Sequence, residues 1–334
     1  MQLPELLVPT ADPRLQATVD AIIADQQPDG SIPWFRGDKM DPWNHVEAAM
    51  ALVVGDRRPE ADRAFEWMAR NQLEQGCWYA YYRDGKVSDD TLDTNVTAYV
   101  AVGAWLHFLV FEDPQFLAGY WPVIERALGF VLALQKPSGA VRWARNVRGR
   151  PTRKGLIAGS SSIHLSLRAT ARIARILGVD GTLYDDAASR LAAALRDRPD
   201  EFLDKSQWAM DWYYPVMCGA LRGRAARDRI DQKWHTFVVP GRGVRCVRHR
   251  PWVTAAETCE LAMALVSIGD RARARLLYEW AQHLRGDDAA YWMGTNFRVG
   301  AFWPPNRPTW SSAAVVLAAD ALAGGPVAQL FGKE

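Results

Sequence analysis

The chain carries almost no net charge, because 40 Lys and Arg residues nearly balance 38 Asp and Glu residues and leave a formal charge of +2. Binding to nucleic acid or to an anionic membrane surface through the overall field requires a clear excess of basic charge. Neither kind of partner is predicted. A hydrophobic fraction of 49% and a charged fraction of 23% are ordinary for a globular protein and argue against disorder.

Cysteine is also scarce, and its positions suggest no structural role. Cys77, Cys218, Cys246 and Cys259 show neither a Cys-x-x-Cys pair nor the spacing of a disulfide framework. Such cysteines are typical of reduced thiols in a cytoplasmic protein. The N-terminus shows no signal-peptide pattern, and the longest apolar run, about 96–111, is short for a membrane span. We therefore expect a soluble, cytoplasmic protein that does not span a membrane.

Strand-like alternation is nearly absent, and helical periodicity dominates the chain. Twelve segments have apolar residues at helical spacing, and they come as six pairs. Repeats of this kind are typical of stacked helical hairpins, either an open solenoid or a closed ring. The second helices of the pairs begin near residues 43, 93, 159, 211, 253 and 309, about 53 residues apart on average.

The loops distinguish the two ends of the hairpins. Connections between successive pairs are short, whereas those within a pair are roughly 10 to 25 residues long and hold most of the Trp, Tyr, Pro and Arg. The second helices are Ala-rich and apolar, as expected of an inner ring, and the first helices carry Arg and Glu, as expected of an outer ring. A functional site is therefore expected among the long loops and the first turns of the second helices.

A short motif repeats in register with the hairpins. Gln-x-x-x-Gly followed closely by Trp occurs four times, each time where a first helix ends. The Gly can adopt a left-handed helix cap, and the Gln with the aromatic ring can tie the turn to the next hairpin. The four copies are Gln26/Gly30/Trp34, Gln72/Gly76/Trp78, Gln135/Gly139/Trp143 and Gln282/Gly286/Trp292.

These motifs resemble the QW repeats of the squalene/hopene cyclase and protein-prenyltransferase superfamily, whose domains are rings of six helical hairpins. The segment 112–128 is also similar to the outer helices of glucoamylase-type (α/α)6 glycosidases. Both resemblances imply an all-α fold, a single (α/α)6 toroid domain of twelve helices over residues 1–334. We expect short flexible termini, about 1–11 and 325–334, and a cavity that opens at the N-termini of the inner helices.

Four acidic residues near the starts of inner helices are the candidate catalytic groups. Asp93 and Asp211 stand at expected N-cap positions, where Asp commonly does no more than accept backbone N–H groups. Glu47 and Glu257 lie within Ala-rich helices, where a buried carboxylate must be paired, protonated or functional. For Glu257 the structural alternative is an ion pair with an arginine such as Arg248.

Aromatic and polar residues at the same helix ends are candidates for substrate binding. His45 and His164 have the alternative of packing or hydrogen bonding in the core. The serines at 160–162 lack a Gly-x-Ser-x-Gly elbow, which argues against a nucleophilic serine hydrolase. The predicted substrate-binding residues are Trp43, His45, Asn95, Tyr99, His164, Trp212, Tyr213, Arg248, Trp252, Arg307 and Trp310.

The isoprenoid enzymes of the resembled superfamily require motifs that this chain lacks. A terpenoid cyclase of this kind protonates its substrate with the middle Asp of Asp-x-Asp-Asp, and the nearest match, 90–94, has Leu92 at that place. A protein prenyltransferase binds zinc through Asp-x-Cys and a later His. The segment 257–259 imitates the first part, but His283 is the only downstream His and is expected on an outer helix. No metal ion and no cofactor is predicted.

Carbohydrate chemistry fits the loops better. A glycosidase needs two carboxyl groups across a cleft, one of them with a raised pKa, together with aromatic stacking surfaces. The first hypothesis is therefore an enzyme that cleaves or rearranges a glycan or glycolipid by acid/base chemistry. An isoprenoid enzyme is the second and a non-catalytic binding toroid the third. The expected partner is a small-molecule, oligosaccharide or lipid-linked substrate, and the oligomeric state stays undefined.

Overall fold

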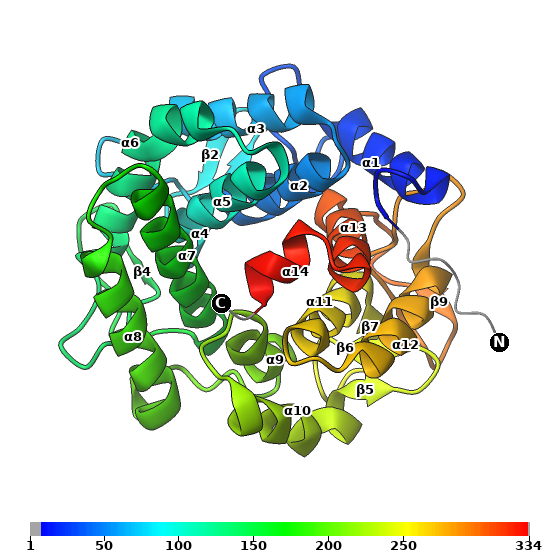
Figure 1. Cartoon of the computed structure of the whole chain (residues 1–334). Helices are drawn as coiled ribbons and strands as arrows, with labels where there is room; N and C mark the ends of the chain where they lie inside the picture. Colours follow the sequence, from blue (N-terminus) through cyan, green and yellow to red (C-terminus); the bar gives the residue numbers. More distant parts are fainter. Residues whose placement is uncertain (1–7, 333–334) are drawn as a thin grey trace.

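A computed structural model describes residues 8–332, and its helices form a closed ring of two concentric layers (Figure 1). The predicted fold class, an (α/α)6 toroid, is confirmed. The outer layer consists of α1 (Pro13–Asp25), α3 (Arg58–Asn71), α6 (Pro114–Leu132), α8 (Thr182–Asp197), α10 (Gly223–Phe237) and α12 (Arg271–Ala281). The inner layer consists of α2 (Pro42–Val54), α4 (Thr94–Ala98) with α5 (Val100–Phe111), α7 (Ile157–Ile176), α9 (Met210–Met217), α11 (Ala255–Ser267) and α13 (Thr309–Ala323).

The ring closes where its two ends meet. The last inner helix, α13, packs against both α1 and α2. At its first residue, the Thr309 backbone N–H donates to the carbonyl of Trp34 (2.6 Å) and its hydroxyl donates to that of Pro33 (2.8 Å). Contacts between residues as far as 276 positions apart thus convert a row of hairpins into a toroid with one core.

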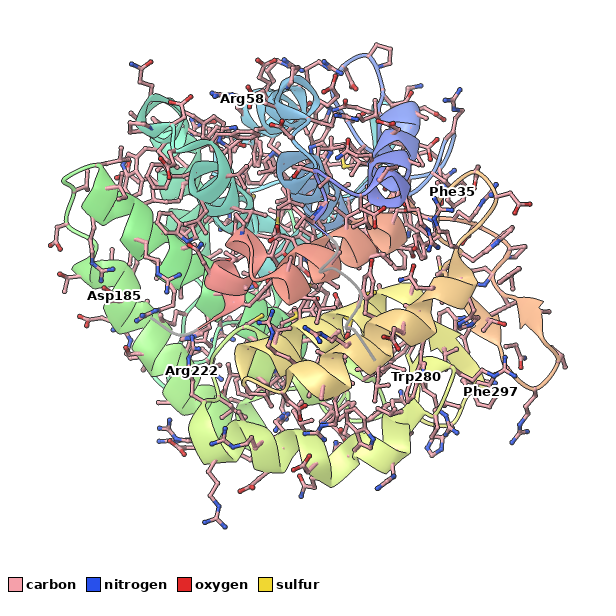
Figure 2. The ribbon with its side chains drawn as sticks, turned by 45° about the vertical axis from the view of Figure 1, so that its right-hand side comes forward. Phe35, Arg58, Asp185, Arg222, Trp280 and Phe297 are labelled. Atoms are coloured by element: carbon pink, nitrogen blue, oxygen red, sulfur yellow. The ribbon has the colours of Figure 1, made fainter. Side chains whose placement is uncertain are left out.

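The two layers differ in burial as their compositions predict. Inner helices touch neighbours on all sides, and α5 is buried from Val100 to His107. The combined α4–α5 segment, Thr94–Phe111, is apolar and long enough to cross a membrane, but 78% of it is buried inside the protein, as in a core helix. Figure 2 shows outer-layer side chains at the rim of the ring, among them Arg58 of α3 and Asp185 of α8.

The repeated Gln and Gly residues join neighbouring hairpins in three of the four copies. The Gln72 side-chain amide donates to the carbonyl of Gly76 in its own turn and to that of Val123 in the next outer helix, both at 2.9 Å. Gln26 and Gln135 make the equivalent pairs of bonds. Gly76 has a φ of +87°, and a Cβ there would lie 2.2 Å from a backbone oxygen of α6. The glycine is required by both its conformation and this close approach.

The fourth copy of the motif is built differently. Gln282 lies in a short 3-10 helix, η2 (Gln282–Leu284), and its amide donates to Tyr278 within the preceding helix. Its oxygen accepts the hydroxyl of Tyr291 (2.6 Å). The non-Gly residue with positive φ in this turn is Ala289, at +67°. Gln282 therefore fixes the turn internally, and the link to the neighbouring hairpin comes from Ala289, whose carbonyl accepts the hydroxyl of Thr18 in α1 (2.9 Å).

Short strands in the long loops are the main feature that the sequence did not predict. Most contain two or three residues, too few to show an alternating pattern. The last five form one antiparallel sheet, and Phe297, just after β8, lies at the periphery in Figure 2. The strands are β1 (Tyr81–Arg83), β2 (Lys86–Asp89), β3 (Leu92–Asp93), β4 (Ala144–Arg145), β5 (Val238–Val239), β6 (Gly243–Arg245), β7 (Trp252–Thr254), β8 (Gly294–Asn296) and β9 (Ala301–Phe302). A second 3-10 helix, η1, spans Pro199–Glu201.

The C-terminal segment forms an additional helix in place of the flexible terminus expected from about residue 325. Helix α14 (Pro326–Phe331) lies in the centre of the ring in Figure 1 and packs against α5, α11 and α13. Its apolar side chains Val327, Leu330 and Phe331 are buried, which explains why the segment is ordered. Residues 1–7 and 333–334 of the expected termini lie outside the described part of the chain.

Candidate active site

Two adjoining cavities lie at the ends of the inner helices, among the long loops. The larger has a volume of about 400 Å³ and the smaller about 260 Å³. Both are lined by Trp43, Asp93, Trp143 and Met210, so they form two lobes of one cleft, here called the large lobe and the small lobe. The other residues of the large lobe are Trp34, Asp41, Asn44, Glu47, Ala80, Tyr81, Asp89, Thr91, Val96, Tyr214, Ala256, Glu257, Glu260 and Trp310. Those of the small lobe are Thr94, Asn95, Leu156, Ala158, Gly159, Ser160, Ile163, Lys205, Trp208 and Asp211.

The ring brings all four predicted carboxylates to this cleft. Glu47 and Glu257 line the large lobe, Asp211 lines the small lobe, and Asp93 lines both. They come from four different inner helices, α2, α11, α9 and the start of α4. Each helix begins at the same face of the ring, so residues near these starts converge although they are far apart in sequence.

Glu257 is held by neutral donors and not by an arginine. Its carboxylate accepts the hydroxyl of Thr254 and is hydrogen-bonded to the thiol of Cys246. Arg248 is exposed and donates to His249 (2.7 Å). Among residues 8–332, Glu257 forms no ion pair, so the structural alternative considered for it does not occur. Its side chain is buried, with 8% of the residue exposed.

Two further buried glutamates adjoin Glu257. Burial, followed by the charge of Glu257, raises the pKa of Glu260 to about 7, although the hydroxyls of Tyr213 and Tyr214 donate to its carboxylate and oppose the rise. The pKa of Glu47 is raised well above its ordinary value by burial and then by the charge of Glu260. Protons are therefore retained in this cluster near neutral pH.

Asp93 combines the role of a helix cap with a place in the cleft. Its Oδ1 accepts the backbone N–H groups of Asn95 (2.7 Å) and Val96 (3.0 Å), as an N-cap does. Burial nevertheless raises its pKa to about 6, and these two hydrogen bonds only partly offset the rise. Asp93 thus caps α4 through Oδ1 and also lines both lobes of the cleft.

Asp211 does not cap its own helix, contrary to the expectation. The N-cap of α9 is Ala209, and Asp211 lies in the first turn. Its Oδ1 accepts the backbone N–H of Ala158 (3.2 Å), in the first turn of α7. Burial raises its pKa to about 6, while this hydrogen bond and the charge of Arg229 lower it. Asp211 thus links two neighbouring inner helices at the small lobe.

Three of the predicted substrate-binding residues line the cleft, and two lie directly behind it. Trp43 lines both lobes, Asn95 the small lobe and Trp310 the large lobe. Tyr99 packs edge-to-face on Trp43, with ring centroids 5.9 Å apart. Tyr213 donates to Glu260, so both tyrosines support the cavity wall.

The two predicted histidines and Trp212 have structural partners instead. His45 lies between the backbone N–H of Ile32 (3.0 Å) and the carbonyl of Ala64 (3.0 Å). His164 contacts the carbonyl of Ala188 (3.1 Å), and the Trp212 indole donates to a backbone carbonyl of α10. None of the three lines either lobe. The packing alternative describes both histidines.

The predicted loop residues also lie outside the two lobes. Arg307 pairs with Asp288 (2.6 Å), and its guanidinium lies over the ring of Trp292. Trp252 packs edge-to-face against Trp303 in the five-stranded sheet. Arg248 also lines neither lobe. The composition of the loops therefore could not predict which of their side chains face the cleft.

Two buried carboxylates of the large lobe, Glu260 and Asp41, were missing from the predicted set. Glu260 follows Glu257 by three residues, a spacing that places both on one helix face and could have identified it. Asp41 precedes Pro42 as the N-cap of α2 and resembles an ordinary cap. It accepts the indole N–H of Trp34 and the side-chain amide of Asn44, both at 2.7 Å. Burial raises its pKa despite these bonds.

Comparison with known proteins gives one close relative and many similar structures. No protein-family model matches the chain. It is 44% identical over 320 residues to the protein named MMP endo-(1,4)-3-O-methyl-alpha-D-mannosidase from Mycolicibacterium hassiacum, and the alignment covers 96% of this chain and 88% of that protein.

Solved structures with low sequence identity share the fold. A wild-type glycosidase superposes with a TM-score of 0.73 at 16% identity, over 92% of this chain and 96% of that one. An alpha-amylase from Clostridium perfringens gives 0.68 at 9% identity, over 93% and 99% of the two chains. A D-mannose isomerase gives 0.68 at 11% identity, over 97% and 100%. These likenesses show that the chain shares its fold with glycosidases and with an isomerase, and none of these three structures is a cyclase or a prenyltransferase.

Proposed function

The chain belongs to the family of the MMP endo-(1,4)-3-O-methyl-alpha-D-mannosidase of Mycolicibacterium hassiacum, and on that premise we propose that it hydrolyses internal α-(1→4) bonds in chains of 3-O-methylmannose. It is a carbohydrate-active enzyme of the glycoside hydrolase kind, and the isoprenoid alternative is not favoured. The observation that carries the finer proposal is a two-lobed cleft with carboxylates at its junction and on its wall.

The shared wall of the two lobes indicates where the scissile bond lies. A chain that fills both lobes must pass the junction, and Asp93 is the acidic residue that lines both. With a pKa of about 6, Asp93 holds a proton for part of the time near neutral pH and can give it to the departing glycosidic oxygen. We assign it the role of general acid.

Glu257 is the opposing group in this proposal. It lines the large lobe, and the donors at Thr254 and Cys246 hold its carboxylate in place. A carboxylate opposite the acid either activates a water molecule or attacks the anomeric carbon, depending on the separation of the two groups. Glu47 and Glu260 lie beside it as protonatable neighbours and not as a second acid/base pair.

Aromatic residues supply the surfaces on which sugar rings stack. Trp43 and Trp143 line both lobes, and Trp34 and Trp310 line the large lobe with their ring centroids 5.7 Å apart. Apolar faces of pyranose rings pack on such indoles, and the methyl ethers of the proposed substrate add to the apolar area.

Hydrolysis of a defined oligosaccharide tests the proposal. Purified protein is incubated with an α-(1→4)-linked 3-O-methylmannose oligomer, and the products are sized. Release of internal fragments supports endo-hydrolysis, and no cleavage of any such oligomer contradicts the function. Asp93→Asn should lower kcat by ~100-fold or more on this substrate but far less on an aryl glycoside whose leaving group needs no proton. An equal loss on both substrates would remove Asp93 from the role of acid.

We further propose that the protein works in the cytoplasm. All four cysteines are buried and free, as is usual for a protein of a reducing compartment. Cell fractionation with an antibody against the chain tests this, and recovery from the culture medium would contradict it.

A further inference from the structure

We infer that the small lobe is the subsite that selects a 3-O-methylated sugar unit. In this inference the methyl ether packs on Leu156 of the apolar wall, and Asn95 and Asp211 accept hydrogen bonds from the remaining hydroxyls of the sugar. The inference rests on the proposed function, because it concerns how the same cleft reads its substrate. The fold alone does not indicate which sugar unit the small lobe selects.

The wall of the small lobe is mainly hydrocarbon. Leu156, Ala158 and Ile163 line this lobe only, and Met210 lines both. These side chains offer neither donors nor acceptors, so a free hydroxyl placed against them loses its hydrogen bonds to water. A methyl ether in the same place has no donor to lose and gains the burial of one methyl group.

Among the polar residues of this lobe, two have a buried acceptor atom without a partner. Asn95 Oδ1 and Asp211 Oδ2 are buried, and neither is hydrogen-bonded by any of the residues that the structure describes. Both residues are more than nine-tenths buried, with 6% and 5% exposed. Because a buried acceptor without a donor is unfavourable, these two atoms point to a ligand that brings donors.

The chemistry of the proposed substrate supplies a matching number of donors. In an internal 1,4-linked 3-O-methylhexose, the oxygens of carbons 1 and 4 are in glycosidic bonds and that of carbon 5 closes the ring. The oxygen of carbon 3 carries the methyl group. Only the hydroxyls of carbons 2 and 6 remain. The two hydroxyl donors of the sugar thus match the two unpartnered acceptors of the small lobe, and its methyl ether matches the apolar wall.

Leu156 offers a test that spares the fold. It is half-buried at the N-cap of α7, where its own side chain makes no capping bond and Asp211 accepts the Ala158 N–H of the first turn. Leu156→Asn has nearly the same size and places a favoured N-cap residue there, so the variant should fold. Leu156→Met is the matched control, because it keeps the wall apolar.

The readout is the ratio of kcat/KM for 3-O-methylated over unmethylated α-(1→4)-mannooligosaccharides. One buried methyl group corresponds to about fourfold. The wild-type protein and Leu156→Met should therefore favour the methylated chain by about fourfold or more, and Leu156→Asn should lose about fourfold of that preference. If the wild type cleaves the methylated chain and Leu156→Asn keeps the full preference, the inference is wrong and the proposed function survives. If the wild type cleaves neither chain, both fall.

A second variant examines the acceptors. Asp211→Asn keeps an oxygen for the N–H of Ala158 and removes the charge of the unpaired acceptor. Wild-type protein should lose roughly tenfold in kcat/KM when the hydroxyl facing Asp211 is removed, as a 2-deoxy or 6-deoxy unit. Asp211→Asn should lose the same factor with the intact sugar and little more with the deoxy sugar. Equal losses for both proteins with each deoxy sugar would show that Asp211 does not accept either hydroxyl.

Discussion

Replacement of Glu257 by glutamine separates a catalytic role from a structural one. Gln keeps the shape of the side chain and one oxygen, which can still accept from Thr254 and Cys246. It removes the charge that the proposed mechanism requires. We expect turnover to fall by ~100-fold or more, equivalent to about 3 kcal/mol of barrier, which is the usual scale of acid/base assistance.

The effect on stability should be small, and its sign follows from the neighbouring charges. Within residues 8–332 no cation pairs with Glu257, so the substitution leaves no buried arginine without a partner. Burial is the main cause of the raised pKa of Glu260 and Glu47, and the charge of Glu257 adds to the rise in both, because the negative groups repel one another. Loss of one charge relieves this repulsion and offsets the weaker hydrogen bonds. The melting temperature should stay equal to that of the wild type or rise slightly.

The assay combines turnover on the methylated oligosaccharide with thermal unfolding of the same sample. Glu66→Gln is the matched control, because Glu66 is exposed on the outer helix α3, away from both lobes, and pairs at the surface with Arg70 (3.3 Å). The control should keep turnover within about threefold, since surface substitutions of this kind are nearly neutral. A Glu257→Gln protein with wild-type turnover per folded molecule and a marked loss of stability would refute the reasoning.

Three further predictions concern protons and packing. With Asp93 as the acid, kcat/KM should fall as pH rises through about 6, and a profile flat to pH 8 would contradict this. Because the folded-state pKa of Glu260 is raised to about 7, its stabilising contribution is complete below about pH 4.5 and is lost as pH rises toward 7. The unfolding free energy of Glu260→Gln should therefore rise relative to that of the wild type by up to ~3 kcal/mol as the pH goes from about 4.5 to 7, as measured by denaturant titration. A difference between the two proteins that does not change with pH would contradict this. Gly76→Ala should lower the unfolding free energy by about 2 kcal/mol or more, since its Cβ would meet the Arg126 carbonyl at 2.2 Å, whereas Gly119→Ala, which meets nothing, should not.

Much of the fold could be predicted because its signals are local. Apolar spacing of three and four residues, caps and short connections all act within a few turns of helix, and the ring contains the expected six pairs. The strands of two or three residues have no such signal, since loop geometry and distant partners create them. Helix α14 was missed for a related reason: six residues are too short for a periodic pattern, and its burial depends on the hole left by the other helices.

The candidate site could likewise be predicted only where its signals are local. Positions near the starts of inner helices were predictable, because helix register fixes which side chains face the ring axis, and Glu47 and Glu257 were found in this way. The positions of Arg248 and Arg307 relative to the cleft could not be predicted, because a loop side chain is placed by the loop conformation and not by helical periodicity. Asp41 was missed because its local pattern as an N-cap is complete without any function.

The glutamate cluster shows why the site stands out against the architecture around it. Glu47, Glu257 and Glu260 lie on two inner helices that are otherwise almost entirely apolar and small, and each is more than nine-tenths buried. Ring closure brings these acidic groups together, and the pKa values of Glu47 and Glu260 are raised by burial and then by the neighbouring charges. Leucine at these positions would suit the packing of an inner helix better than glutamate does. Equivalent positions of the inner helices hold Ala, Val or Leu, whereas the positions at the cavity hold glutamates that can keep a proton. This departure from the inner-helix pattern therefore identifies the functional end of the ring.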